Sequence, residues 1–410
     1  LLTGDCMKNK TLGSTLIVAG TTIGAGMLAM PLTSAGIGFG FTVVLLVSLW
    51  LLLSFTALLF VEAYQTVDSD AGLGTLAEKY YGTLGRVVST AVLIIFLYAI
   101  LSAYVSGGSS ILGGLLPTIV DAETTTKIAG VIFTVVFGSF IVVGTTSVDA
   151  VNRIIFATKI LAFILVLGLL LPKVTVDHLL AMPINNALLI SAMPIFFTSF
   201  GFHGSIPSLN KYLDGNVKAL RISIVVGTAI PLIAYILWQL ATHGVLSQTE
   251  FMEILERDPT LNGLAEAAHH ITGSSIVGIV VRLFSALALI TSFLGVALGL
   301  FEALEDLLKR VNISAGRKSL GLLTFLPPML FAFFYPQGFI TALGYAGQMF
   351  AFYAVVLPIA MVWRLRSQNA NLAYRVKGGK ASLIIALVIG VFIVIVPFLI
   401  QQGLLPQVVG

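Results

Sequence analysis

The sequence predicts an all-α membrane protein in which two of the transmembrane helices are broken. Of its 410 residues, 58% are hydrophobic and only 10% are charged, whereas soluble domains carry about 25% charged residues. The apolar residues gather in stretches that are long enough to cross a bilayer, which takes about 20 residues. Two of these stretches contain glycines followed by a proline, a pattern that interrupts a helix.

The apolar stretches predict eleven transmembrane helices in a single domain over residues 11–410. Residues 1–10 are expected to form a cytoplasmic N-terminal segment, in which Met7 resembles the natural beginning of a chain. The predicted helices are 11–37, 40–64, 84–114, 126–144, 150–172, 187–209, 221–242, 276–304, 319–335, 339–363 and 381–402.

The first stretch carries three glycines and a proline within residues 19–31. Gly24 and Gly26 allow the helix to unwind at little steric cost, and Pro31 disfavours helix at Met30. Unpaired backbone groups are costly in hydrocarbon, so a break is tolerated only where it lines a cavity or a binding site. The alternative is a glycine-rich face used for helix packing.

The sixth stretch repeats this pattern, with Gly201 and Gly204 followed by Pro207. Because it lies five helices after the first, it enters the membrane from the opposite side. Two broken helices at corresponding positions indicate a secondary transporter built from an inverted repeat. The first repeat is then about 11–172 and the second about 187–363, with 381–402 as an additional helix.

The basic residues predict the orientation. With the N-terminus in the cytoplasm, most of the 22 Lys and Arg residues lie on the cytoplasmic side, which is the usual bias, and the C-terminus lies outside. The longest outside loop, about 243–275, is acidic. Phe251, Ile254 and Leu255 predict a short amphipathic helix within it.

Six motifs, in a similarity that runs from about Met7 to the C-terminus, resemble the hydroxy/aromatic amino acid permease family of the amino acid–polyamine–organocation superfamily. The motifs are 21–31, 72–76, 198–205, 291–299, 342–347 and 374–379. The resemblance implies a LeuT-like 5+5 inverted repeat. It also implies a proton-coupled symporter that imports L-tyrosine across the bacterial inner membrane by alternating access. A tryptophan or serine/threonine permease, with sodium coupling, is the alternative.

The expected partners are therefore L-tyrosine, the proton and membrane lipid, with no cofactor, metal, nucleic acid or obligate protein partner. A channel is disfavoured because it does not need a closed site for one solute at the middle of the membrane. An enzyme is disfavoured because the sequence shows no His-Glu metal cluster and no paired carboxylates within the apolar stretches. No catalytic residue is expected.

An amino acid carries a carboxylate and an ammonium, which a broken helix can bind through its backbone. Amides near Gly24, Ala25 and Gly26 suit the carboxylate, and carbonyls around Thr21, Thr22, Thr198 and Ser199 suit the ammonium. Aromatic side chains would face the substrate ring, although in a chain with 27 Phe and 11 Tyr any one aromatic more often faces lipid or packs between helices. The predicted substrate-binding residues are Thr21, Thr22, Gly24, Ala25, Gly26, Met27, Ser102, Thr198, Ser199, Phe200, Phe202, His203, Tyr345 and Gln348.

For two further polar residues, the sequence leaves two roles possible. His203 in the second break could take part in the site or make a structural hydrogen bond across the broken backbone. Glu62, near the inner end of the second helix, is expected to be a gate or an anchor.

Lys159 is the expected proton-coupling group. It lies roughly 9–15 Å into the fifth helix, at 1.5 Å per residue, and an intramembrane lysine is a functional candidate. Burial disfavours its charged form, and it resembles the fifth-helix lysine of proton-coupled members of the superfamily. Its expected partners are carbonyls of residues 20–23 and the hydroxyls of Thr291 and Ser292. The alternative is a lysine that anchors the helix from a water-filled vestibule.

Overall fold

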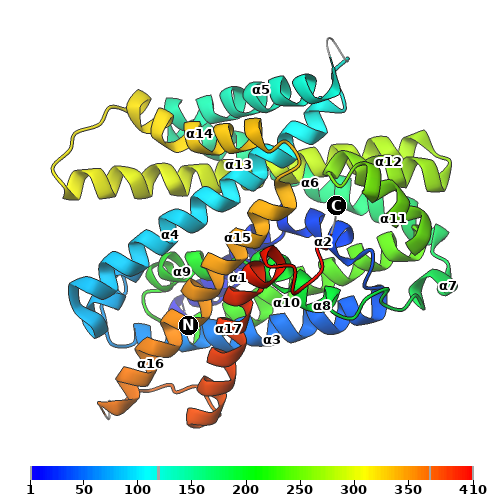
Figure 1. The fold of residues 1–410 in the computed structure, drawn as a ribbon. Coiled ribbons are helices and arrows are strands. Elements are labelled where there is room, and N and C mark those ends of the chain that lie inside the picture. The colour runs from blue at the N-terminus through cyan, green and yellow to red at the C-terminus, as the bar shows by residue number, and fades with distance from the viewer. Residues whose placement is uncertain (1, 118–120, 369–370, 409–410) are drawn as a thin grey trace.

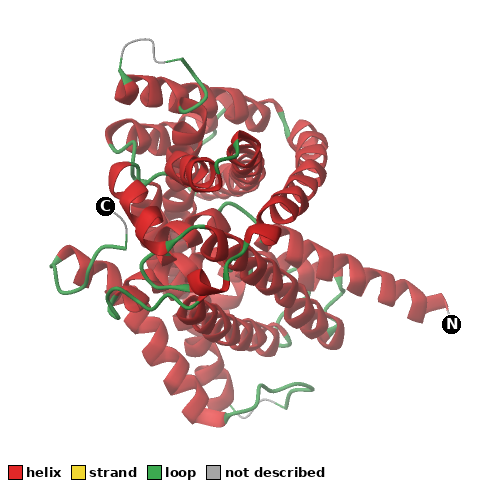
Figure 2. Ribbon diagram, turned by 90° about the vertical axis from the view of Figure 1, so that its right-hand side faces the viewer, coloured by secondary structure: helices red, strands yellow, loops and turns green. Residues whose placement is uncertain are grey.

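Every regular element of the described chain is a helix, which confirms the predicted all-α class (Figure 1, Figure 2). The computed structural model describes the backbone of residues 2–117, 121–368 and 371–408 and, apart from residues 2–6, 8, 9 and 145–153, their side chains.

The first half of the chain begins with a helix that breaks in the middle. Its two parts, separated by residues 23–25, are bent by 48° relative to each other. The helices of this half are α1 (Leu2–Thr22), α2 (Gly26–Ser34), α3 (Phe39–Tyr64), α4 (Leu73–Gly113), α5 (Ala122–Val143) and α6 (Thr145–Leu170).

The second half also begins with a broken helix, α8 (Leu188–Ser199) and α9 (Ile206–Tyr212), joined through the short turn η2 (His203–Ser205). It continues with α10 (Val217–Val245), α13 (Ser275–Arg310), α14 (Arg317–Phe334), α15 (Phe339–Ala351), the π-helical turn η3 (Phe352–Val356), α16 (Leu357–Ser367) and α17 (Gly379–Gln401). The connections carry η1 (Leu171–Lys173), α7 (Val176–Leu179), α11 (Gln248–Arg257) and α12 (Leu261–Thr272).

The two broken helices lie in the middle of the molecule. In Figure 1, α1, α2, α8 and α10 occupy the centre, α5 and α14 lie at the top, and α16 and α17 project at the bottom. Helix α1 packs along α10, and α2 packs against α8. The breaks are therefore surrounded by other helices, and the groups that they expose are held inside the bundle.

Nine helices of the described chain are long and apolar enough to cross a membrane, or ten when α1 and α2 count as one bent span. The predicted helix 319–335 corresponds to α14, which is not among them. This helix has only 18 residues, it opens on Arg317 and Lys318, and it contains Pro327 and Pro328. The count of eleven stays a prediction.

Some predicted boundaries are wrong. The third helix was expected from residue 84, but α4 begins at Leu73 and bends at Gly82, where φ is 61° and only glycine is relaxed. Charged residues around 78–79 concealed this first segment. Helix α1 also begins within the predicted segment 1–10. The amphipathic helix predicted within the loop 243–275 is confirmed as α11, whose Phe251 and Leu255 are buried, and α12 follows it.

Several basic residues that were predicted to share one side do lie at one end of the bundle. Lys10, at the start of the first span, forms an ion pair with Asp214 in the turn between α9 and α10. Arg221 at the start of α10 lies 4.0 Å above the ring of Tyr374 in the loop between α16 and α17. This grouping agrees with the predicted topology, in which these loops emerge on the same side.

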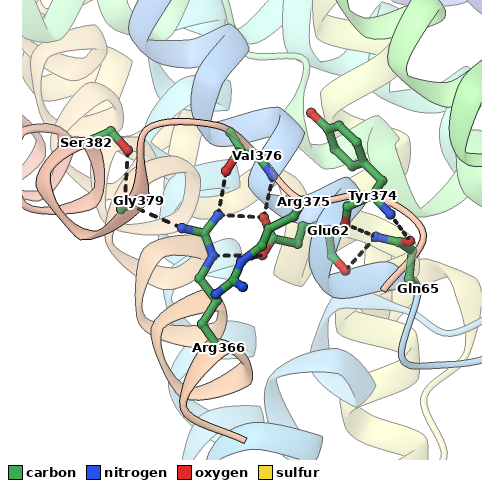
Figure 3. A network of polar contacts seen from close by, with 8 residues as sticks. All are labelled: Glu62, Gln65, Arg366, Tyr374, Arg375, Val376, Gly379 and Ser382. Atoms are coloured by element: carbon green, nitrogen blue, oxygen red, sulfur yellow. Dashed lines mark hydrogen bonds and ion pairs between the residues drawn. The ribbon is translucent and has the colours of Figure 1, made fainter. Parts of the chain in front are cut away.

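Glu62 ties three elements together at that end (Figure 3). Its carboxylate is fully buried and accepts two hydrogen bonds from the Arg366 guanidinium on α16, at 2.8 and 2.7 Å. It also accepts a hydrogen bond from the amide of Val376, at 2.8 Å. One turn away, the amide side chain of Gln65 donates to the carbonyl of Tyr374 and accepts from its N–H. Glu62 is thus an anchor in this structure, one of its two expected roles.

We expect Glu62→Gln to lower the free energy of unfolding by about 3–5 kcal/mol, because it leaves the largely buried Arg366 without its counter-charge. Glu78→Gln, which removes the half-exposed partner of Arg86, should cost only about 0–1 kcal/mol. Denaturant unfolding of both variants in detergent makes the comparison. Equal losses would contradict the anchoring role of Glu62.

Candidate functional site

The first break presents backbone groups that no helix satisfies. The amide of Ala25 donates to the hydroxyl of Ser292 on α13, at 2.8 Å. Within the described chain, the amides of Gly24 and Gly26 donate no hydrogen bond to a protein acceptor. These two amides lie at the start of α2, where the helix dipole favours an anion. The break therefore offers two of the three amide donors that the sequence suggests for a carboxylate, whereas the Ala25 amide already has a protein acceptor.

The helix breaks at these glycines, as the sequence predicts, and the structure shows that both also lie where a side chain would meet a neighbouring helix. Gly24 and Gly26 do not have positive φ angles. A Cβ atom on Gly24 would lie 2.5 Å from the hydroxyl oxygen of Ser292, and one on Gly26 would lie 2.9 Å from the Cα of Ser199. Glycine at position 26 thus allows the two broken helices to approach each other.

The expectation that Pro31 disfavours helix at Met30 is wrong, because α2 runs from Gly26 to Ser34 with Pro31 inside it. Proline lacks the N–H that would bond the carbonyl four residues earlier, which is that of Met27. The indole N–H of Trp238 donates to this carbonyl instead, at 3.1 Å. A side chain from α10 therefore replaces the missing helix bond and holds α2 against α10.

The second break lies at residues 200–202, as the sequence predicts, and it touches the first. The hydroxyl of Ser199 donates to the carbonyl of Gly26, at 2.9 Å. Thr198 donates to the carbonyl of Leu343 on α15, at 3.2 Å. Phe200 is fully buried, and its ring stands edge-on to Tyr235 with centroids 5.1 Å apart.

Tyr235 on α10 joins the two breaks. Its hydroxyl lies 2.6 Å from the carbonyl oxygen of Thr22 and 2.6 Å from that of Ser199. These are the last residues of α1 and α8, whose carbonyls lack helical partners. Carbonyls around four residues, Thr21, Thr22, Thr198 and Ser199, are the ones that the sequence suggests for a ligand ammonium. Two of them, those of Thr22 and Ser199, contact the same hydroxyl.

Lys159 lies next to the same break on its other side. Its ammonium donates to the carbonyl of Ile23 at 2.7 Å, and the hydroxyl of Thr291 is 3.4 Å away. The ammonium also lies 4.5 Å from the centre of the Phe156 ring. The side chain is 2% exposed, so it does not reach an aqueous surface. Both partners are among those that the sequence predicts.

Several other predicted site residues make their hydrogen bonds elsewhere. The exposed Thr21 bonds the carbonyl of Ile17, and the hydroxyl of Thr22 likewise bonds within α1, to Val18. Their positions on α1 turn these side chains away from the break, and only the Thr22 carbonyl reaches it.

Three more predicted side chains are held by α4 or α17. Ser102 bonds the carbonyl of Tyr98 within α4. The amide of Gln348 donates to Val394 on α17, and Gln401 at the end of α17 donates to the hydroxyl of Tyr345. The expectation that Tyr345 and Gln348 face a ligand is therefore wrong for this structure, since the additional helix α17 covers that face of α15.

His203 links the second break to α3. Its Nε2 lies 3.0 Å from the Thr56 hydroxyl, and its ring packs against Phe202, Phe60 and Phe350. This arrangement is a packing role, but the hydrogen bond goes to a side chain of α3 and not across the broken backbone, as the structural alternative expected. It also places Phe202 in the packing around the histidine.

Sequence analysis missed Tyr235 and Trp238, two residues that bind the break carbonyls. A signal was present in the predicted helix 221–242. Tyr235, Trp238 and Thr242 recur three and four residues apart and form a stripe that can donate hydrogen bonds along one face of an apolar helix.

Comparison with known proteins assigns the chain to a family. The model of the tryptophan/tyrosine permease family matches residues 7–397. This chain belongs to that family. The permease is therefore a multi-pass membrane protein, in agreement with its apolar helices.

Three relatives cover nearly the whole permease. The tyrosine-specific transport system 1 of Haemophilus influenzae is 66% identical over 98% of this chain and 100% of its own length. The tyrosine-specific transport system 2 of the same organism is 58% identical, again over 98% and 100%. A tryptophan-specific transport protein of Pseudomonas aeruginosa is 32% identical over 98% of this chain and 97% of its own.

The described part of the permease contains no group of three His, Cys, Asp or Glu side chains that could hold a metal ion. The polar groups gathered at the breaks are backbone amides, backbone carbonyls, hydroxyls and one lysine. This set suits a ligand with both a carboxylate and an ammonium.

We expect Trp238→Phe to destabilise the permease by about 1–3 kcal/mol, because the Met27 carbonyl loses its donor. Pro31→Ala supplies an N–H to that carbonyl within α2. The cost of Trp238→Phe should therefore be smaller in the Pro31→Ala background, as measured by denaturant unfolding of all four proteins. Strictly additive losses would show that the indole does not replace the missing helix bond.

Proposed function

We propose that this permease is a proton-coupled symporter that imports L-tyrosine across the bacterial inner membrane by alternating access. The observation that carries the proposal is the meeting of two broken helices, whose end carbonyls both lie 2.6 Å from one hydroxyl. The relatives named as tyrosine-specific transport systems, at 66% and 58% identity, support the substrate. The N-terminus is then cytoplasmic and the C-terminus periplasmic, as the basic residues favour.

The packing pattern supports a LeuT-like 5+5 inverted repeat. In such a repeat, α1 and α2 correspond to α8 and α9, α3 to α10, α4 to α13, α5 to α14, and α6 to α15. Under this correspondence, each packed pair in one repeat should have an equivalent pair in the other. The α1–α10 contact is matched by the α8–α3 contact, and the α4–α15 contact by the α13–α6 contact. Corresponding helices also pack on each other, as α3 does on α10 and α5 on α14. A two-fold relation of this kind places the breaks together at the middle of the membrane.

The two breaks provide complementary groups for an amino acid. The substrate carboxylate would accept from the amides of Gly24 and Gly26 at the start of α2. Its ammonium would donate to the carbonyls of Thr22 and Ser199. The buried ring of Phe200 adjoins these carbonyls through Tyr235 and can offer its edge or face to an aromatic side chain.

Lys159 is the proposed proton carrier. The lysine donates to the carbonyl of Ile23, which directly follows Thr22, whose carbonyl is proposed to bind the substrate ammonium. The proton and the substrate would therefore act on neighbouring peptide groups of the first break. When charged, the lysine holds α6 to the break, and loss of its proton weakens that bond. Its burial argues against an anchor that extends into water. Its ammonium also lies between the first break and α13, which disfavours a sodium ion there.

Uptake into proteoliposomes tests the function. Purified permease should accumulate labelled tyrosine when the lumen is alkaline relative to the outside, and accumulation should stop when a protonophore removes the gradient. Unlabelled tyrosine should compete better than tryptophan, serine or threonine. Preference for tryptophan by more than tenfold would contradict the substrate assignment, and a requirement for sodium would contradict the coupling ion.

We expect Gly26→Val to abolish uptake while the protein remains folded, because the added side chain would meet the backbone of Ser199 and cover the carboxylate donors. Gly168→Val is the matched control, since nothing lies within 4 Å of a Cβ atom at Gly168 on α6. Tyrosine uptake is measured for both variants, and their size-exclusion profiles show whether they are folded. Near-normal uptake by Gly26→Val would remove this break from the binding site.

We expect Lys159→Gln to lose accumulation driven by a pH gradient but to retain counterflow exchange of tyrosine, because exchange does not require net proton movement. Lys127→Gln, which alters the surface ion pair with Glu123 on α5, should behave as the parent protein does. If Lys159→Gln still accumulates tyrosine in response to a pH gradient, another group carries the proton.

A further inference from the structure

The hydroxyl of Tyr235 has more acceptors than it can satisfy. It lies 2.6 Å from each of the carbonyl oxygens of Thr22 and Ser199. A phenol carries one hydrogen, so only one of the two carbonyls can receive a full hydrogen bond at any time. Tyr235 is fully buried, so the other carbonyl does not gain a partner from bulk water.

An unpaired carbonyl inside a membrane protein is costly. The two carbonyls end α1 and α8, so neither has a helical donor. An ammonium group carries three N–H donors, and at the same position it could bond both carbonyls at once. The geometry around Tyr235 therefore suits an ammonium better than it suits a hydroxyl.

We propose that the Tyr235 hydroxyl occupies the place of the substrate ammonium in the empty protein and is displaced when substrate binds. This inference rests on the proposed function of the site. The hydroxyl holds the two breaks together while no substrate is present. Because it satisfies them only in part, an amino acid can replace it, whereas an analogue without an amino group cannot.

Helix α10 can release the hydroxyl without leaving the site. Trp238 lies one turn further along the same helix and donates to the Met27 carbonyl on α2. The indole bond keeps α10 attached to the first broken helix while the Tyr235 hydroxyl leaves the carbonyls of Thr22 and Ser199.

The test is the binding of two ligands to the full-length protein and to Tyr235→Phe. The ligands are tyrosine and 3-(4-hydroxyphenyl)propionate, which lacks the amino group. In the parent protein, tyrosine must break the hydroxyl bond before it binds, and in the Phe variant this bond is absent. Tyr235→Phe should therefore bind tyrosine about three- to tenfold more tightly, the equivalent of one hydrogen bond. Its affinity for the deaminated analogue should not change.

Tyr64→Phe is the matched control. Tyr64 ends α3 and is buried, and its hydroxyl has no hydrogen-bond partner in the described part of the chain. This variant should bind both ligands as the parent does.

Three results would overturn the inference. Weaker binding of tyrosine alone by Tyr235→Phe would show that the hydroxyl contacts the bound substrate. An equal change for both ligands, or no change, would show a structural role only. A parent protein that binds no tyrosine would overturn the proposed function itself, and this inference with it.

A second measurement retains the tyrosine hydroxyl at position 235, so it does not depend on the folding of the Phe variant. 3-Fluorotyrosine is incorporated at position 235, and its fluorine NMR resonance is followed. The resonance should move when tyrosine is added and stay in place with the deaminated analogue. A resonance that responds to both ligands alike, or to neither, would contradict displacement by the ammonium.

Discussion

The structure depends on one constraint, which is that every backbone amide and carbonyl within the membrane needs a partner inside the protein. A continuous helix meets this need by itself, and the two broken helices do not. Their breaks release carbonyls at Thr22, Ile23 and Ser199, and Pro31 releases another at Met27. Lys159 donates to the Ile23 carbonyl and Trp238 to that of Met27, whereas the single hydroxyl of Tyr235 contacts both remaining carbonyls and can bond only one at a time.

The partners come from helices that are otherwise ordinary apolar spans. Tyr235 and Trp238 lie on α10, Lys159 on α6 and Ser292 on α13. Backbone groups within the breaks therefore hold α6, α10 and α13 around the first broken helix. A ligand that takes over one of these bonds changes how the surrounding helices are held, which is the physical basis for linking substrate binding to movement.

The hydrogen bonding around the Glu62 anchor differs from that at the two breaks. Its carboxylate is fully buried and has a charged guanidinium, a backbone amide and a second nearby arginine as partners. Both carboxylate oxygens of Glu62 accept hydrogen bonds. These bonds fix the ends of α3 and α16 and the loop before α17 to one another. The molecule thus combines a firmly bonded end with a centre whose hydrogen bonds, in the proposed function, are exchanged for those of the substrate.

The sequence by itself determined the membrane class and the positions of both breaks, because hydrophobicity, glycine and proline act locally along the chain. It could not determine what satisfies the breaks. Tyr235 meets a carbonyl 213 positions away, and nothing in the spacing of the chain specifies such a pairing. The tertiary structure also decided that Gly26 serves close packing, that Pro31 stays within a helix, and that α17 takes Gln348 and Tyr345 away from the site. Each of these depends on which helices become neighbours, and that follows only from the packing of the whole bundle.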